Sequence, residues 1–158
     1  MTDKDRTHEW PDIAGRIQDK VHYLPIRVYY EDTDFSSAVY HANYLKFCER
    51  GRSDCLRILN IHHHELRDGV HWQETAGYMG FVVRHMECDF LGPAQIDDLL
   101  SVETRFAEAR GARLLLDQKV LRDDAVLFQA IVTVAIVTAD GKPVRLPKQL
   151  LSKLEEMI

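Results

Sequence analysis

One long amphipathic segment, followed by four strand-like segments with no second long helix, constrains the fold of this chain most. Residues 42–59 repeat apolar side chains at the spacing of one helix face. Four later runs have strand-like alternation or composition and are separated by turn residues: 81–91, 100–106, 114–120 and 126–137. Another strand-like run, 23–30, precedes the helix. Consecutive strands with short turns favour an antiparallel sheet covered by the only long apolar helix, which predicts an α+β fold.

Gly51 lies in the middle of the predicted helix. An interior glycine costs a helix about 1 kcal/mol relative to alanine. Close approach of the helix backbone to the sheet would compensate for this cost, so we expect the helix to lie tightly against the strands.

The N-terminal part of the chain carries a second helical pattern. Apolar residues recur every three or four positions between Trp10 and Val21, and Pro11 suits a first helical turn. We therefore expect an N-terminal arm over residues 1–21 with a short amphipathic helix, followed by a single domain over residues 22–158. A length of 158 residues fits one ordinary domain.

Composition and charge exclude several classes of protein. The chain has 20 basic and 25 acidic side chains and a net charge of −5, which disfavours nucleic acid and anionic membranes as partners. Its most apolar stretch, residues 125–139, is shorter than a membrane span needs, and the N-terminus has no apolar secretory segment. We therefore expect a cytoplasmic protein. Cys48, Cys55 and Cys88 have no CxxC spacing, which predicts reduced core residues.

The densest polar cluster lies between the first predicted strand and the long helix, over residues 30–41. The first helical turn offers backbone N–H groups that can polarise a carbonyl or stabilise an oxyanion. A carboxylate just upstream, Asp32 or Asp34, could attack that carbonyl or activate water. This arrangement suits acyl transfer to water. The competing interpretation is that these residues are helix caps and turn formers, since caps greatly outnumber active sites.

Other candidate groups are weaker. His41 and Glu49 can be read as surface charges of the helix, and Tyr40 as a packing residue. The run 62–64 contains three histidines, but consecutive residues cannot all face one ion, so no metal site is expected. Ser36 and Ser37 lack the GxSxG context of a serine hydrolase.

Several spaced motifs are together similar to a known family. They are residues 27–34 (RVYYEDTD), 39–47 (VYHANYLKF), 49–50 (ER), 81–84 (FVVR), 93–94 (PA), 97–98 (DD), 110–111 (RG) and 146–148 (LPK). The chain resembles the 4-hydroxybenzoyl-CoA thioesterase family over residues 22–150, and within it the bacterial acyl-CoA thioesterases associated with the Tol–Pal cell-envelope system.

The resemblance implies a hotdog fold, in which a curved antiparallel sheet of five or six strands wraps one long helix. It implies edge-to-edge dimers assembled into a homotetramer, with active sites between subunits. The catalytic aspartate of the family falls on Asp34, as nucleophile or general base, and the backbone N–H that polarises the thioester falls on His41. Tyr40, Arg110 and Arg113 become candidate contacts to an acyl-CoA substrate. No metal or redox cofactor is implied, and proteins of the cell envelope or of lipid synthesis are the implied partners.

One departure from the family keeps an alternative open. Family members usually have glycine at Ser37, and often at both Ser36 and Ser37, where the extra side chains here could narrow the acyl pocket or change the loop dihedrals. The leading hypothesis is hydrolysis of an acyl-CoA thioester to a free acid and CoA. A catalytically weak CoA or acyl-carrier binding module is the alternative, and a hotdog enoyl-CoA hydratase is a third hypothesis.

Overall fold

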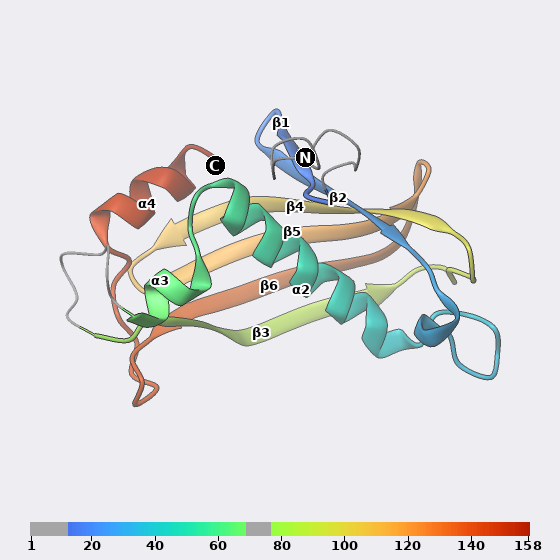
Figure 1. Cartoon of the computed structure of the whole chain (residues 1–158), viewed down its shortest axis with the longest axis horizontal. Coiled ribbons are helices and arrows are strands. Elements are labelled where there is room, and N and C mark those ends of the chain that lie inside the picture. The colour runs from blue at the N-terminus through green and yellow to red at the C-terminus, as the bar shows by residue number, and fades with distance from the viewer. Residues whose placement is uncertain (1–12, 69–76) are drawn as a thin grey trace, which may run out of the picture.

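A computed structural model describes residues 13–68 and 77–158 of the chain. These residues form a six-stranded antiparallel sheet with the order β1-β2-β4-β5-β6-β3 (Figure 1). The strands are β1 (Arg16–Gln18), β2 (Val21–Arg27), β3 (Gly80–Phe90), β4 (Leu99–Arg110), β5 (Arg113–Arg122) and β6 (Ala125–Val137). The helices are α2 (His41–Ile58), α3 (His63–Asp68) and α4 (Lys148–Glu155), and η1 (Tyr30–Asp32) is a single 3-10 turn.

The long helix α2 lies across one face of the sheet, as the α+β hotdog prediction requires (Figure 1). All five predicted strands are present, and their bounds differ from the expected ones by a few residues. The first of them ends at Arg27 rather than at Tyr30, because the chain turns into η1 there. The two short helices α3 and α4 were not predicted, and α4 adds Leu150 and Leu154 to the core.

The predicted N-terminal amphipathic helix is wrong over the described residues. Residues 16–18 form β1, which pairs with β2 in a tight hairpin and extends the main sheet. The turn residues Asp19 and Lys20 have φ angles of 51° and 64°, as a two-residue hairpin with two left-handed positions requires. Neither position is a glycine, so the usual sequence signal of this turn is absent. Residues 10–12, where the helix was expected to begin, lie outside the described residues.

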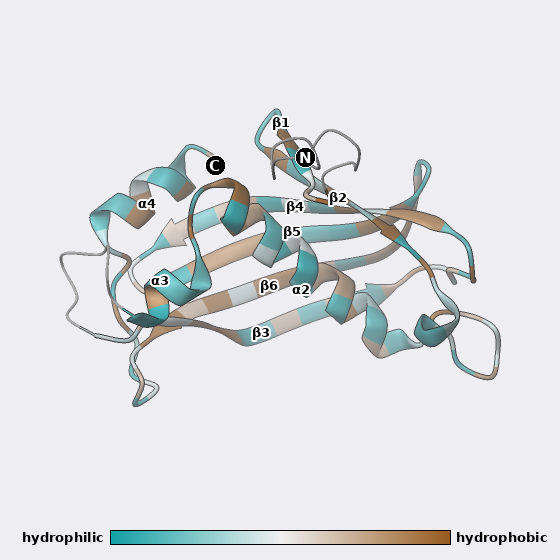
Figure 2. Cartoon of the chain, in the orientation of Figure 1, coloured by the Kyte–Doolittle hydropathy of each residue, from teal (hydrophilic) through white to brown (hydrophobic). Residues whose placement is uncertain are grey.

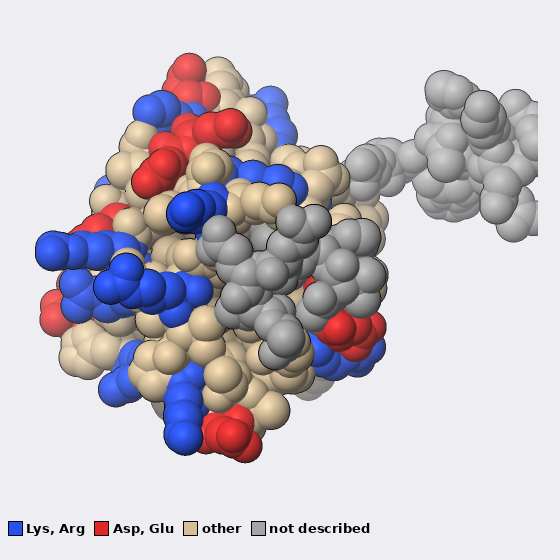
Figure 3. All heavy atoms as spheres, turned by 90° about the vertical axis from the view of Figure 1, so that its left-hand side faces the viewer, with Lys and Arg blue, Asp and Glu red and all other residues tan. Residues whose placement is uncertain are grey.

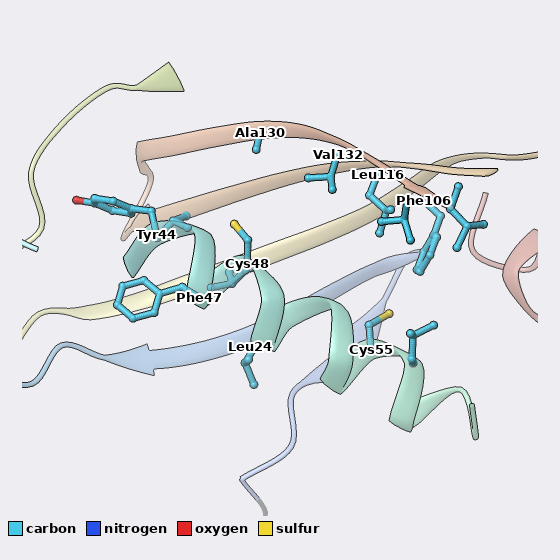
Figure 4. Packing of buried hydrophobic residues seen from close by; sticks show 14 of the residues in the cluster. Leu24, Tyr44, Phe47, Cys48, Cys55, Phe106, Leu116, Ala130 and Val132 are labelled. Carbon is cyan, nitrogen blue, oxygen red and sulfur yellow. The ribbon is translucent and has the colours of Figure 1, made fainter. Parts of the chain in front are cut away.

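The core fills the space between α2 and the sheet. Apolar residues of the helix face the inner side chains of the central strands (Figure 4). Figure 2 shows hydrophobic positions along the central strands and alternating hydrophilic and hydrophobic positions along α2. Cys48 and Cys55 are buried and free, as predicted, and Cys88 is partly buried against the same core. Burial raises the pKa of both Cys48 and Cys55 to about 12, so these thiols stay protonated.

Gly51 sits where the helix backbone lies close to the sheet. A Cβ atom at this position would lie 2.9 Å from Val102 Cγ1 and 3.0 Å from Thr104 Oγ1. The predicted close approach of helix and sheet is therefore confirmed, and it explains why a residue unfavourable to helices occupies this position.

A buried polar pair ties the N-terminal hairpin to the helix. His22 on β2 is fully buried, and its Nε2–H donates to Asp54 Oδ2 on α2 at 2.7 Å. The backbone N–H of Gly15 donates to the same carboxylate oxygen at 2.8 Å. The sequence analysis did not identify this pair, because a histidine and an aspartate 32 residues apart carry no local pattern.

Candidate functional site

The loop between β2 and α2 is held in place by backbone hydrogen bonds on both sides. Val39 N–H donates to Ala94 O at 2.8 Å, and Asp34 N–H donates to Ala38 O at 3.0 Å. The Tyr44 hydroxyl accepts the N–H of Ala94 at 2.9 Å and donates to Gly92 O, which joins the first turn of α2 to the same neighbouring loop. The loop and the start of the helix are thus fixed relative to each other.

Asp32 has a structural role. Its side chain is buried and accepts the Tyr29 N–H at 2.9 Å, and its backbone oxygen accepts from both Tyr40 N–H and the Asn43 amide. These bonds close the 3-10 turn η1 ahead of α2, which is a turn-forming role; the N-cap of α2 is Tyr40, without a side-chain cap.

Of the two aspartates of the loop, Asp32 and Asp34, only Asp34 is exposed. Its Oδ1 accepts two hydrogen bonds from Ser36, one from the backbone N–H at 2.8 Å and one from the hydroxyl at 2.5 Å. Within the described ranges, Oδ2 accepts none, so one oxygen is free to react. The Ser36 hydroxyl and N–H, with a smaller attraction from His41, lower the pKa of Asp34 below its ordinary value. The group is therefore a carboxylate at neutral pH.

His41 is the first residue of α2, and its backbone N–H lies at the positive end of the helix dipole. In the part of the chain that the structure describes, the N–H groups of His41 and Ala42 have no acceptor, as is usual for a first helical turn. A free carboxylate oxygen and free N–H donors therefore occur on the same loop and helix start, a combination that can attack and polarise one carbonyl.

Aromatic side chains surround these polar groups. The rings of Tyr40 and His41 are 4.5 Å apart, and Phe90 at the end of β3 packs edge-on to His41 at 6.1 Å. Tyr30, Phe35 and Ile96 line an open hollow together with Asp34. Tyr30 and Phe90 were not identified as site residues from the sequence, although Tyr30 stands only four positions before Asp34.

Arg110 and Arg113 lie at the other end of the molecule, at the turn between β4 and β5. Arg113 is in register with Ala135 on β6, whereas Phe90, the neighbour of His41, is in register with Phe128. Seven residues of β6 separate these positions, about 23 Å at 3.3 Å per residue. Within one chain, Arg110 and Arg113 therefore lie far from Asp34. Lys and Arg side chains gather on this far end, which faces the viewer in Figure 3.

The two serines that replace the family's glycines have distinct roles. Ser36 donates to Asp34, as described above, and Ser37 has a φ angle of 70°, in the left-handed region that glycine adopts easily. The loop thus keeps the backbone conformation that glycine would favour, with a side chain in a strained position.

The three consecutive histidines do not form a metal site in the described residues. His62, His63 and His64 border a hollow with Arg57 and Arg67, and over residues 13–68 and 77–158 no cluster of three potential metal ligands occurs. Among the helices of the same ranges, none is long and apolar enough to cross a membrane.

The structure combines the hotdog architecture with an acid-bearing loop that leads into the central helix. The chain matches the thioesterase superfamily over residues 37–129, and it belongs to this family. The prediction of a thioester hydrolase is thereby confirmed at the level of the family.

Named relatives agree with this assignment. The acyl-CoA thioesterase YbgC of Haemophilus influenzae is 43% identical over 128 residues, which cover 80% of this chain and 89% of the relative. The long-chain acyl-CoA thioesterase FadM of Escherichia coli is 30% identical over 128 residues, 79% of this chain and 90% of that protein. The crystal structure of a probable thioesterase from Bartonella henselae superposes with a TM-score of 0.75 at 46% identity and covers 80% of this chain and 99% of that one.

Proposed function

We propose that this protein hydrolyses acyl-CoA thioesters to a free carboxylic acid and CoA. The observation that carries the proposal is the free Oδ2 of Asp34 on the loop that leads directly into α2, whose first residue, His41, has an unbonded N–H. The names of the relatives above, acyl-CoA thioesterases, support the same substrate class.

In the proposed reaction the thioester carbonyl oxygen accepts the His41 N–H, which stabilises the negative charge that develops on it. As a nucleophile, Asp34 forms a C–O bond to the carbonyl carbon, the C–S bond breaks, and CoA leaves as the thiolate. Water then hydrolyses the mixed anhydride, and the carboxylate is restored. As a general base, Asp34 instead takes a proton from the attacking water and transfers it to the departing sulfur. Both routes consume one water and need no metal or redox cofactor, so activity should survive treatment with a chelator.

The test is release of free thiol from acyl-CoA by the wild type and by Asp34→Asn. Glu31→Gln is the matched control, because Glu31 is an exposed acid of the same loop. Loss of activity in Asp34→Asn alone supports the proposal, and equal activity in all three proteins contradicts it.

We propose that the active unit contains a second copy, joined through β3. This strand is one edge of the sheet, and β6 is its partner on the other side. Arg84 lies in its first half, His85 at its centre, and Glu87 and Asp89 in its second half. Antiparallel pairing of two copies places opposite charges across from each other, whereas parallel pairing places like charges together.

Such a pairing also places Arg110 and Arg113 of one subunit toward the candidate site of the other. It turns the second copy around, so the β4–β5 end of one subunit lies toward the Asp34 end of the other. We propose that these two arginines contact the CoA phosphates of a substrate held by the neighbouring subunit, and that Tyr40 contacts the substrate in its own chain. We also propose that two of these dimers form a homotetramer. We expect this homotetramer in the cytoplasm, with partners in the cell envelope or in lipid synthesis.

Sedimentation tests the assembly. The wild type should sediment as a dimer or tetramer, and Arg84→Glu should shift the population toward the 18.3 kDa monomer. Arg105→Glu, an exposed arginine of β4 away from the edge, is the control. A wild-type monomer would contradict the shared site.

One observation favours the second candidate, a CoA or acyl-carrier binding module with weak catalysis. Ser36 engages Asp34 Oδ1 with two donors, which reduces the basicity of the carboxylate. This candidate predicts calorimetric binding of CoA by the wild type without thiol release from any acyl-CoA.

A further inference from the structure

A small apolar cavity lies between α2 and the first half of β3. Its apolar lining includes Leu56, Phe81, Val82, Phe106 and Leu116, and its volume is about 140 Å³. Phe106 and Leu116 are visible on the sheet side of the helix in Figure 4. The cavity is open to solvent on one side, and its volume is similar to that of a cavity that holds a benzene molecule, which suits a short acyl group.

One charged side chain of the cavity wall is fixed in position. Arg52 on α2 is half-buried and donates from Nη1 to Gln118 Oε1 at 2.8 Å. The fully buried Gln118 amide is itself oriented, because its Nε2 donates to both Cys48 O and Thr104 Oγ1 at 2.9 Å. The guanidinium is therefore held by a network that reaches from the helix into the sheet.

Arg52 has spare donors and lacks an acidic partner. In residues 13–68 and 77–158, no carboxylate oxygen lies within 4.0 Å of its guanidinium. Burial is the main influence on Arg52 and lowers its pKa from its ordinary value, although the negative charge of Glu49 opposes this. A guanidinium in such a setting is a strong binding site for a carboxylate, which it can contact through two parallel hydrogen bonds.

The cavity and the reacting groups lie at opposite ends of β3. Phe81, Val82 and Val83 at its start line the cavity, and Phe90 at its end packs against His41. In an antiparallel pair of β3 strands, the end of one strand faces the start of the other. The cavity of one subunit then faces the Asp34 and His41 groups of its partner.

We infer that this cavity receives the acyl group of a thioester held by the partner subunit, and that Arg52 selects short acyl groups that end in a carboxylate. The inference rests on the proposed function and on the pairing through β3. Arg52 acts here as a specificity-determining residue, since it meets the far end of the acyl group and not the thioester.

Glu49 lines the same cavity and should weaken the selection of acyl groups that end in a carboxylate. It is exposed, and its Oε1 accepts the Ser53 hydroxyl at 2.6 Å. Its negative charge weakens the attraction of Arg52 for an anionic acyl end, so removal of that charge should strengthen the selection.

The test compares glutaryl-CoA with isoheptanoyl-CoA, in which two methyl groups replace the two carboxylate oxygens. We expect the wild type to have the higher kcat/KM for glutaryl-CoA. Arg52→Met should lower the ratio of the two kcat/KM values by about 10- to 100-fold, mainly through KM for glutaryl-CoA. Glu49→Gln should raise the ratio, and Arg50→Met, an exposed arginine of the same helix outside the cavity, should leave it unchanged.

A purely structural role of Arg52 would reduce both activities together and leave the ratio unchanged, which would overturn the inference. Wild-type preference for isoheptanoyl-CoA would also overturn it, with the proposed function intact. Thiol release from neither substrate nor from any other acyl-CoA would contradict the proposed function and, with it, this inference.

Discussion

Ser36 gives Asp34 two hydrogen bonds on a single carboxylate oxygen, from its N–H at 2.8 Å and from its hydroxyl at 2.5 Å. These bonds hold the carboxylate in one orientation and leave its second oxygen free. They also favour the ionised form, so Ser36 sets the pH range in which the reacting group is charged.

Replacing Ser36 by alanine should therefore move the acid limb of the pH–rate profile. The hydroxyl is the main cause of the lowered Asp34 pKa, so its loss lets that pKa rise toward its ordinary value. The carboxylate is the active form, and activity should begin to fall at a higher pH than in the wild type. Measurement of kcat/KM from neutral to acidic pH checks this, and an unchanged limb would mean that Ser36 does not control Asp34.

Ser37→Gly should stabilise the protein. Ser37 has a φ angle of 70°, and a left-handed conformation costs a non-glycine residue about 1–2 kcal/mol. The greater freedom of glycine in the unfolded chain offsets part of this, which leaves a gain of about 0.5–1 kcal/mol in the free energy of unfolding. Urea denaturation measures the gain, and Ser36→Gly, at a position without a positive φ, should instead lose stability.

Gly51→Ala should destabilise the chain despite the better helix propensity of alanine. The new Cβ would lie 2.9 Å from Val102 Cγ1, and overpacking of this kind costs about 1–3 kcal/mol against a propensity gain of about 1 kcal/mol. We expect a net loss of about 1 kcal/mol in the free energy of unfolding. A companion Val102→Ala substitution makes room, so the two changes should be non-additive in a double-mutant cycle.

The buried pair of His22 and Asp54 should make stability depend on pH. Burial is the main influence on His22 and lowers its pKa below 6.5, although Asp54 opposes this. The unfolded chain therefore takes up a proton near pH 6.5 that the folded chain does not, and the free energy of unfolding falls as pH drops through this value. In His22→Gln the fall between pH 7.5 and 5.5 should be shallower, and a wild-type slope in that variant would contradict this account.

The sequence predicted those parts of the fold that depend on local periodicity. The helix over residues 42–59 and the central strands were identified because their apolar spacing repeats over many residues, and Gly51 indicated the contact between them. The N-terminal hairpin was missed because its three-residue strand is too short to show alternation, and because Asp19 and Lys20 adopt a turn usually marked by glycine.

The candidate site was predictable only as far as it is continuous in sequence. Asp34, Tyr40 and His41 lie within eight residues, so one loop contains them all. Local composition left Asp32 and Asp34 both open, and only the resemblance to the family selected Asp34. The structure adds a physical difference, since Asp32 is buried and bonded within its turn whereas Asp34 is exposed. Phe90 and Arg52 reach their places through strand pairing and helix packing, which a single sequence does not reveal.

The most direct test of the account is thiol release from a panel of short, long and aromatic acyl-CoA substrates by the wild type and by Asp34→Asn. The substitution keeps the shape of the side chain and removes its charge, so the fold and CoA binding should persist while turnover falls by about a thousandfold or more. Rapid release by the wild type that disappears in Asp34→Asn is the result we predict. Comparable release by both proteins would contradict the assignment of Asp34 as the reacting carboxylate.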